Sequence, residues 1–213
     1  MSWRLTVLKT CSFFESILRK IPVNKPLVVD ADGLWFLSES PPDIRLQLSN
    51  CTVLTPNSVE FSRLQSSPLF EKLGEDFEIF GNCLETSDGE VSALVKGATD
   101  ELYCPYTKTY EHIVCEFGMA RRAGGQGDVL AGILITLLSW VSIKSRADEP
   151  VGWRTNHGRR DNAVKCATFI IRQAQSEAFS KNFRGTLASD VILEIPKVVN
   201  FMLNHGESGG VLE

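Results

Sequence analysis

The sequence has few of the residues that build metal centres. It contains three histidines, His112, His157 and His205, which are too dispersed for a metal cluster or a catalytic triad. Its six cysteines include no CxxC pair. We therefore expect structural or solvated histidines and reduced, structural thiols, and neither a zinc site nor a disulfide framework.

Runs of basic charge and long apolar runs are also scarce. No stretch of Lys and Arg exceeds two consecutive residues and the formal net charge is −4, so the sequence predicts no nucleic-acid partner. The most apolar stretch, Val129 to Leu138, is shorter than the roughly 20 residues of a membrane span. It predicts a buried helix and no membrane partner.

The first twenty residues carry four basic side chains and a single acidic one, Glu15. This composition faintly resembles a mitochondrial presequence, but an ordinary amphipathic helix is the simpler interpretation. The amphipathic helix and the reduced thiols together indicate a cytoplasmic location. The presequence interpretation makes the mitochondrion the alternative.

What is present indicates an α/β protein. A chain of 213 residues with 43% hydrophobic content fits one globular domain with a substantial core. Short apolar runs alternate with longer helical patterns, which predicts a mostly parallel sheet covered by helices on both faces. The predicted strands are 26–29, 51–54, 93–95 and 112–115.

The C-terminal third continues this pattern. The segment Lys144 to Arg160 contains proline, glycine and many charges, so we expect an exposed loop there. Asp161 is expected to cap a helix, and Ser189-Asp190 a second one. The tail Gly206 to Glu213 is expected to fray. The first of these helices should bury one face, made of Ala163, Ala167, Ile170, Ile171, Ala174 and Ala178.

Each predicted strand stops just before a segment of small or polar residues. Ligands of open parallel sheets bind outside the carboxyl ends of the strands. We therefore expect four segments to meet at one edge of the sheet and form one pocket, namely 30–33, 55–57, 96–97 and 118–128.

The glycine turn 124–127 leads directly into the apolar helix. Glycines let backbone N–H groups approach an anion, and the positive end of the helix dipole stabilises its charge, so the turn predicts a phosphate site. Asp128 follows at once, and a carboxylate beside a phosphate is unfavourable unless it accepts a proton. It is therefore the candidate base of a phosphoryl transfer. The alternative is an ordinary first-turn acid favoured by the helix dipole.

The other segments allow two interpretations each. Asn57 and Glu60 have the spacing of a helix capping box, but Glu60 could also organise Mg²⁺ through water. Lys96-Gly97 fits either a nucleotide-contacting corner or a surface turn. Asp30 and Asp32 could neighbour a substrate or cation, although acidic residues that close a strand are common.

Taken together, these segments resemble a known family. They are DADGLW at 30–35, LTPNSVEFSRL at 54–64, VKGATD at 95–100 and GMARRAGGQGDVLAG at 118–132, followed by TLASDVILEIP. In this order they are similar to the eukaryotic ATP-dependent NAD(P)H-hydrate dehydratases of the ribokinase-like superfamily. Sugar kinases share the NxxE and GxGD elements but not the whole set.

The resemblance implies a ribokinase-like fold and a repair reaction. In that reaction ATP phosphorylates the hydroxyl of the S epimer of hydrated NADH or NADPH, and loss of phosphate restores NAD(P)H. Asp128 would be catalytic and would touch the hydrate, and Mg²⁺ would offset the charge of the transferring phosphoryl group. The hydrate would also contact Asn57, Ser58, Val59, Glu60, Phe61, Ser62 and Arg63. ATP would contact Lys96, Gly97, Ala98, Thr99, Asp100, Gly118, Met119, Ala120, Arg121, Arg122, Ala123, Gly124, Gly125, Gln126 and Gly127.

The sequence also departs from this family. Full-length members have several β/α units before the DADGL strand, where residues 1–20 stand here. The resemblance therefore implies a single domain, 1–213, that corresponds to the C-terminal portion of the family domain. The alternatives are a ribokinase-like small-molecule kinase and a catalytically impaired nucleotide-binding form. The oligomeric state stays open, a homo-oligomer included.

Overall fold

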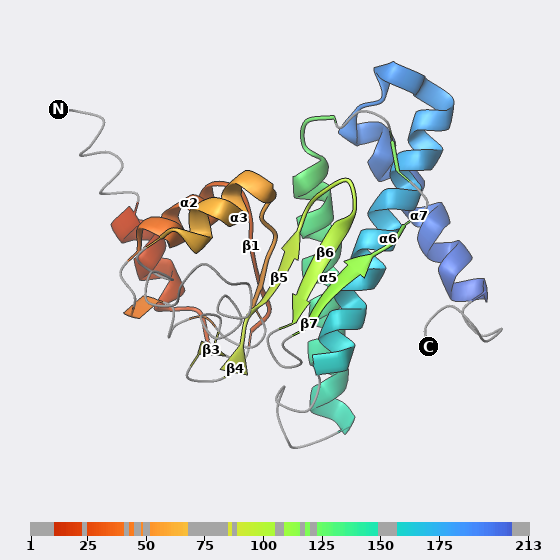
Figure 1. The fold of residues 1–213 in the computed structure, drawn as a ribbon. Coiled ribbons are helices and arrows are strands. Elements are labelled where there is room, and N and C mark those ends of the chain that lie inside the picture. Colours follow the sequence, from red (N-terminus) through yellow and green to blue (C-terminus); the bar gives the residue numbers. More distant parts are fainter. Residues whose placement is uncertain are drawn as a thin grey trace.

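The computed structural model of this chain describes residues 11–22, 25–40, 43–44, 48, 52–67, 85–86, 89–104, 109–115, 118–119, 123–148 and 157–205. Within these ranges a five-stranded sheet lies between two layers of helices (Figure 1). The predicted frayed tail lies outside the described residues.

The sheet contains parallel and antiparallel pairs. Its strands are β1 (Leu27–Val29), β2 (Thr52–Leu54), β5 (Ser92–Val95), β6 (Asp100–Cys104) and β7 (Thr109–Ile113), in the order β1-β2-β5-β6-β7. The first three pair in parallel. β6 is antiparallel to both of its neighbours, so β7 runs in the same direction as β1, β2 and β5. Two short strands, β3 (Glu85–Thr86) and β4 (Gly89–Glu90), form a separate antiparallel pair.

Four of the five strands overlap the predicted ones, although β7 ends at Ile113 and shares only two residues with the predicted strand 112–115. The predicted mostly parallel α/β fold is confirmed. β6 was missed because its run begins with Asp100 and Glu101, and acidic residues are unfavourable in strands. The structure resolves this conflict by burying Asp100 against Arg172 of a helix, as described below.

The helices form one layer on each face of the sheet, as predicted. α2 (Asp32–Glu39) and α3 (Ser58–Gln65) lie on one face together with the helical residues 11–18. α5 (Gln126–Asp148), α6 (His157–Asn182) and α7 (Ala188–His205) cover the other (Figure 1). Successive strand residues point to opposite faces. Leu54, Ala93 and Tyr103 therefore enter the first core, whereas Val53, Leu94 and Leu102 enter the second.

The segment 144–160, predicted to be an exposed loop, is helical at both of its described ends, and residues 149–156 lie outside the described residues. α5 continues to Asp148 and α6 already begins at His157, so both ends of the segment are helical. Arg160 is only 1% exposed and lies 3.4 Å from the Asp161 carboxylate. Asp161 therefore lies inside α6 and does not cap it. The apolar face predicted for this helix is buried, since all six of its residues belong to the second core.

α5 buries one stripe along its length, formed by Gln126, Leu130, Leu134, Leu138 and Ser142. Trp140 and Ile143 on its other side are 59% and 67% exposed, so the predicted buried helix is buried on one face only. By length and composition alone, Gln126–Ile143 could also cross a membrane, a test that core helices of other proteins pass as well.

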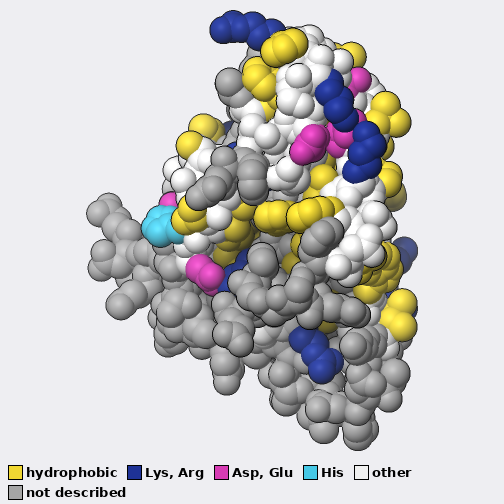
Figure 2. Space-filling model, turned by 90° about the vertical axis from the view of Figure 1, so that its right-hand side faces the viewer, with side chains coloured by type: hydrophobic (Ala, Val, Ile, Leu, Met, Phe, Trp, Pro, Cys, Tyr) yellow, Lys and Arg dark blue, Asp and Glu magenta, His cyan; other side chains and the backbone are white. Residues whose placement is uncertain are grey.

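The buried carboxylate of Glu194 links α7 to α6 through an ion pair. Glu194 lies 2.6 Å from Lys181 of α6 and 3.0 Å from Lys197. Its hydrogen bonds to the two lysines, that to Lys181 first, lower the pKa of the Glu194 carboxyl. α7 starts at Ala188, so Ser189 and Asp190 lie in its first turn and not before it as predicted. The Asp190 carboxylate still accepts a hydrogen bond from the Leu187 N–H at the helix start. Apolar and charged side chains are interspersed on the face in Figure 2.

Candidate functional site

The predicted site segments do meet at the carboxyl edge of the sheet. Lys96, just after β5, forms a parallel bridge with Asn57, just after β2, and its N–H donates to the Pro56 carbonyl at 2.7 Å. Its ammonium lies 2.6 Å from the Asp30 carboxylate, which follows β1. Gly127 of α5 adjoins this pair. Strands β1, β2 and β5 and the N-terminus of α5 thus converge, as the sequence predicts.

Gly127 lies directly against the Asp30–Lys96 ion pair. A Cβ at this position would be 3.3 Å from the Asp30 carboxylate oxygen and 3.8 Å from the Lys96 nitrogen. The two charged side chains are only 15% and 14% exposed, so they have little room to move aside. The glycine is therefore explained by the ion pair as well as by the predicted approach of a phosphate.

The neighbouring Gly125 has a backbone requirement of its own. Its φ of +87° lies in the left-handed region that favours glycine, and a Cβ there would be 3.4 Å from Ala188 of α7. Its carbonyl accepts the first hydrogen bond of α5, from Val129 at 3.1 Å. The unpaired N–H groups of this helix start consequently lie beside the ion pair, which is the geometry of an anion site.

Asp128 is the third residue of α5 and is exposed to solvent. One of its carboxylate oxygens would be 3.9 Å from a Cβ on Gly125, so the carboxylate lies over the turn. This position suits a base that faces a ligand held by the turn. It equally suits a first-turn acid stabilised by the helix dipole, so both sequence interpretations stand.

Asn57 and Glu60 form a complete capping box. The Asn57 side-chain oxygen accepts from the N–H groups of Val59 and Glu60, at 3.0 and 2.9 Å. The Glu60 carboxylate accepts from the Asn57 N–H at 2.8 Å. The structural interpretation of this pair is thereby confirmed. A carboxylate keeps further lone pairs beyond this one bond, so a water-mediated contact to a cation is compatible with the cap.

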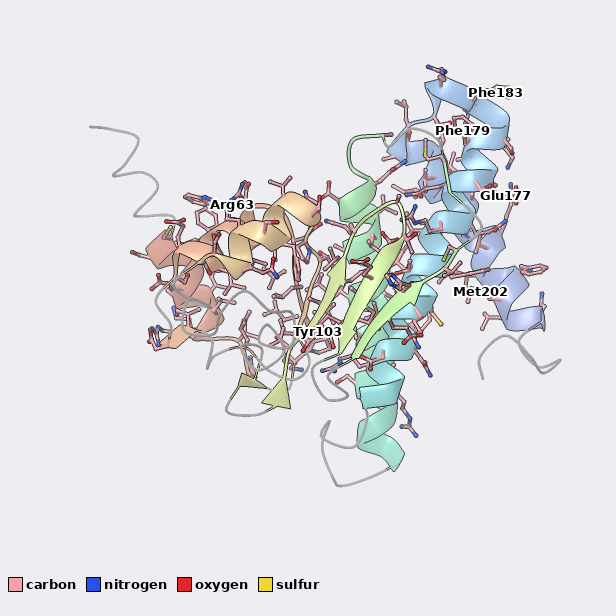
Figure 3. The ribbon with its side chains drawn as sticks, viewed as in Figure 1. Arg63, Tyr103, Glu177, Phe179, Phe183 and Met202 are labelled. Carbon is pink, nitrogen blue, oxygen red and sulfur yellow. The ribbon has the colours of Figure 1, made fainter. Side chains whose placement is uncertain are left out.

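Of the other residues predicted to contact the substrate, one lines the cleft and the others lie in the core or on the surface. Ser58 lines the cleft described below, whereas Val59 is 67% exposed. Phe61 packs against the first core, and Ser62 hydrogen-bonds back to the Ser58 carbonyl. Arg63 is exposed on α3 (Figure 3).

The predicted ATP segment 96–100 forms a tight turn. A Cβ on Gly97 would be 2.5 Å from the Thr99 carbonyl oxygen, so only glycine fits there. The Gly97 N–H donates to the buried Asp100 carboxylate at 2.9 Å, which closes the turn. Arg172 of α6 binds the same carboxylate, a residue that sequence reasoning missed because a lone arginine on an amphipathic helix usually faces solvent.

A cleft of about 500 Å³ opens beside this turn, lined by Asn57, Ser58, Lys96, Gly97, Ala98, Met119 and Arg172. Met119 is held by Gln126, whose amide nitrogen is 2.8 Å from the Met119 sulfur. Gln126 is 7% exposed, and its side-chain oxygen has no partner within the described part of the chain. Residues 120–122 of the predicted ATP segment lie outside the described residues.

The three cysteines whose side chains the structure describes, Cys11, Cys115 and Cys166, are free thiols, as expected. Burial raises the pKa of the Cys115 thiol, partly offset by the nearby Arg172 charge, while Asp100 raises it further. His112 is exposed and lies 3.4 Å from Glu101, outside the residues that line the cleft.

These features define an α/β protein with a candidate anion site at the carboxyl edge of the sheet. We call this site the anion cradle; it consists of the glycine turn 124–127, the start of α5 and the adjoining Asp30–Lys96 pair. A profile of the family described as NAD(P)H-hydrate dehydratase matches residues 9–197. The chain therefore belongs to that family, as its motifs indicated.

Curated relatives agree with this assignment. The chain is 34% identical over 193 residues to the "ATP-dependent (S)-NAD(P)H-hydrate dehydratase" of Drosophila melanogaster, an alignment that covers 90% of this chain and 56% of the relative. The proteins of the same name from Homo sapiens and Caenorhabditis elegans are 35% and 36% identical, with 80% and 82% of this chain covered and 46% and 55% of theirs. The chain thus spans about half the length of these relatives.

Solved structures support the fold. A hypothetical protein from Streptococcus mutans superposes with a TM-score of 0.62 at 18% sequence identity, covering 90% of this chain and 60% of that one. At this identity the similarity concerns the architecture alone.

Proposed function

We propose that this chain takes part in the ATP-dependent dehydration of the S epimer of hydrated NADH or NADPH. The observation that carries the proposal is the placement of Asp128 over a glycine turn at a helix start, whose Gly127 adjoins Lys96, a residue that lines the cleft. Family membership adds the reaction, since the curated relatives bear this activity in their names.

The proposed reaction has two steps. The hydroxyl oxygen of the hydrate attacks the γ-phosphorus of ATP, its proton passes to Asp128, and ADP leaves. Phosphate then leaves the carbon with loss of a proton from the neighbouring carbon, so that the ring double bond forms and NAD(P)H is restored. A base positioned for the first proton typically contributes about 10²–10⁴ in rate.

The chain's own groups have separable tasks. The N–H groups at the start of α5 bind phosphate oxygens as the charge on the transferring group redistributes, and those of Ala98 and Thr99 in the turn after β5 add to them. Lys96 adds a cation whose position is fixed by Asp30. Mg²⁺, when bound, would neutralise charge on the phosphates, and the Glu60 carboxylate would reach it through water.

The direct test is recovery of the reduced-nicotinamide absorbance when hydrated NADH is mixed with protein, Mg²⁺ and ATP. We expect recovery that requires ATP and yields one ADP and one phosphate for each NADH formed. A stable phosphate ester instead of NADH would identify a small-molecule kinase. ATP binding without either product would identify a catalytically impaired nucleotide-binding form, and both results would overturn the proposed reaction.

A further inference from the structure

Arg172 connects two segments of the cleft that are far apart in the sequence. Its side chain extends from α6 to the turn after β5, where its Nε lies 2.9 Å from the Asp100 carboxylate. One terminal nitrogen lies 2.7 Å from the same carboxylate and also donates to the Gly97 carbonyl at 2.8 Å. The guanidinium therefore holds both ends of the turn at once.

The other terminal nitrogen of Arg172 faces the second predicted ATP segment. A Cβ on Gly118 would be 3.4 Å from this nitrogen, and Gly118 precedes Met119 in the wall of the cleft. No hydrogen-bond partner for this nitrogen exists within the described part of the chain. Two N–H donors are thus available at the cleft wall.

The surroundings are mostly dry. The Arg172 and Asp100 side chains are 14% and 5% exposed, so their mutual attraction is little weakened by solvent. A guanidinium binds a carboxylate and a carbonyl in a fixed planar geometry, which a lysine ammonium cannot reproduce. The position therefore requires arginine for its shape as well as for its charge.

We propose that Arg172 is the positioning residue of the nucleotide cleft. It fixes the turn 97–99 through Asp100 and the Gly97 carbonyl, so that the backbone N–H groups of Ala98 and Thr99 stay aligned for a phosphate-bearing nucleotide. Its remaining terminal nitrogen donates to the same ligand. This assignment rests on the proposed function for the identity of the nucleotide.

The test measures Mg-ATP binding to the full chain by calorimetry in the parent, Arg172→Lys and Arg172→Gln. Loss of hydrogen bonds to a charged group predicts an affinity that is about tenfold to a hundredfold lower in both variants. The lysine variant should not rescue binding, because it keeps the charge but loses the planar bridge. Affinity of folded variants within about twofold of the parent overturns the assignment.

Lys165→Gln is a matched control. Lys165 lies on the same helix and also forms an ion pair with the sheet, 2.8 Å from Glu111 of β7, but it does not line the cleft. We expect parental ATP affinity in this variant. Equal losses of affinity in the Lys165 and Arg172 variants would show a general effect of loosening α6 and would overturn the role of Arg172.

A measurement on the unmutated chain guards against misfolded variants. An arginine-selective dicarbonyl reagent is applied with and without Mg-ATP, and the modified peptides are quantified by mass spectrometry. ATP should slow modification of Arg172 several-fold and leave the exposed Arg184 unchanged. The same rate at Arg172 with and without bound ATP overturns the proposal.

These readouts separate the assignment from the dehydratase proposal. If the parent binds ATP without turnover, the proposed dehydration is wrong. Loss of ATP affinity in the Arg172 variants would then still support the positioning role. A parent with turnover but unaltered ATP binding in the variants removes only the role of Arg172. Affinity for hydrated NADH is a further readout, and it should stay near the parental value because its predicted contacts, 57–63 and Asp128, do not include Arg172 or the turn that it holds.

Discussion

The ammonium of Lys96 lies 2.6 Å from the carboxylate of Asp30, and both side chains are mostly buried. The cation predicted to contact ATP therefore already has an anionic partner before any ligand arrives. Its net charge is largely cancelled, so the helix start and the turn 97–99 must supply most of the attraction for phosphate. Asp30 therefore neutralises and positions Lys96, a role that its place after a strand did not specify.

Removing one partner of this pair should destabilise the protein more than removing both. Lys96→Met leaves the Asp30 carboxylate buried and unpaired, at a cost of about 3–5 kcal/mol in unfolding free energy. The double variant Asp30→Asn with Lys96→Met should recover much of that stability but not ATP affinity. Urea denaturation and calorimetric ATP titration measure the two quantities.

The surface pair Arg19–Asp43 is the control for this experiment. Its atoms are also 2.6 Å apart, but its side chains are 44% and 55% exposed. Asp43→Asn should leave the denaturation midpoint nearly unchanged because solvent screens the pair. A loss of stability equal to that of Lys96→Met would mean that burial is not what gives the Asp30 pair its importance.

The three glycines of the turn should respond differently to alanine. Gly127→Ala places a Cβ 3.3 Å from the Asp30 carboxylate, and Gly125→Ala forces a residue with a side chain to a φ of +87°. Both should weaken ATP binding, and valine should weaken it more. Gly124→Ala meets nothing within 4 Å and should keep parental affinity, as measured by calorimetry. Identical effects at all three positions would argue against the cradle geometry.

The sequence allowed the cradle to be located because its parts are local patterns. Strands that end shortly before Asp30, Asn57 and Lys96, and a glycine turn before an apolar helix, are each visible within a few residues. The rule that ligands bind at the carboxyl ends of parallel strands then brings them together. No long-range information was needed for this part of the site.

The ties between distant residues could not be predicted in the same way. Asp100 and Arg172 are separated by 72 positions, and neither has a local pattern that requires the other. The burial of Arg160 was not predicted for the same reason, since its charged neighbourhood in the sequence resembles a loop. A buried charge is specified by its partner in space, which periodicity does not reveal.

Glu60 allows the cap and the cation role to be separated. Glu60→Gln keeps an oxygen that can accept from the Asn57 N–H, so the cap and the stability should persist while the negative charge is lost. We expect a higher Mg²⁺ concentration for half-maximal turnover. Glu60→Ala also removes the cap bond, at a cost of about 1 kcal/mol. An unchanged Mg²⁺ requirement in Glu60→Gln would leave only the capping role.

Glu194 should make the attachment of α7 dependent on pH. Because its folded-state pKa is lowered, its contribution to stability is present above the unfolded pKa of about 4.3 and disappears as pH falls through the folded value. The difference in melting temperature between the parent and Glu194→Gln should thus be large at pH 7 and should shrink as the pH falls below about 4.3. Its partner Lys181 has a raised pKa, so its contribution is lost only in strong base.

Lys197→Gln calibrates this effect. Lys197 is the more exposed of the two partners, at 69% compared with 46% for Lys181, and its hydrogen bond is longer. Its removal should reproduce only part of the Glu194→Gln loss at pH 7. A difference in melting temperature that stays constant from pH 3 to 7 would show that the Glu194 charge does not stabilise α7.

Asp128→Asn should abolish turnover and preserve ATP binding. The carboxylate lies over the glycine turn, close to Gly125, where a bound triphosphate would repel it. Its value there lies in accepting the hydroxyl proton, which Asn cannot do. We expect turnover to fall by about 10²–10⁴ in single-turnover dehydration assays. ATP affinity should stay equal or rise slightly because one repulsive charge is removed.

The competing role for Asp128 predicts the opposite pattern. A first-turn acid that only stabilises the helix start contributes about 0.3–1 kcal/mol, so its loss would lower the melting temperature slightly and leave turnover near the parental rate. Asp190 of α7 provides the comparison, since it occupies the first turn of a helix and accepts from the Leu187 N–H. Asp190→Asn should change stability but not the rate constant for dehydration. Parental turnover by Asp128→Asn would remove it as the base, and loss of ATP binding in a folded variant would make it a residue of the cradle itself.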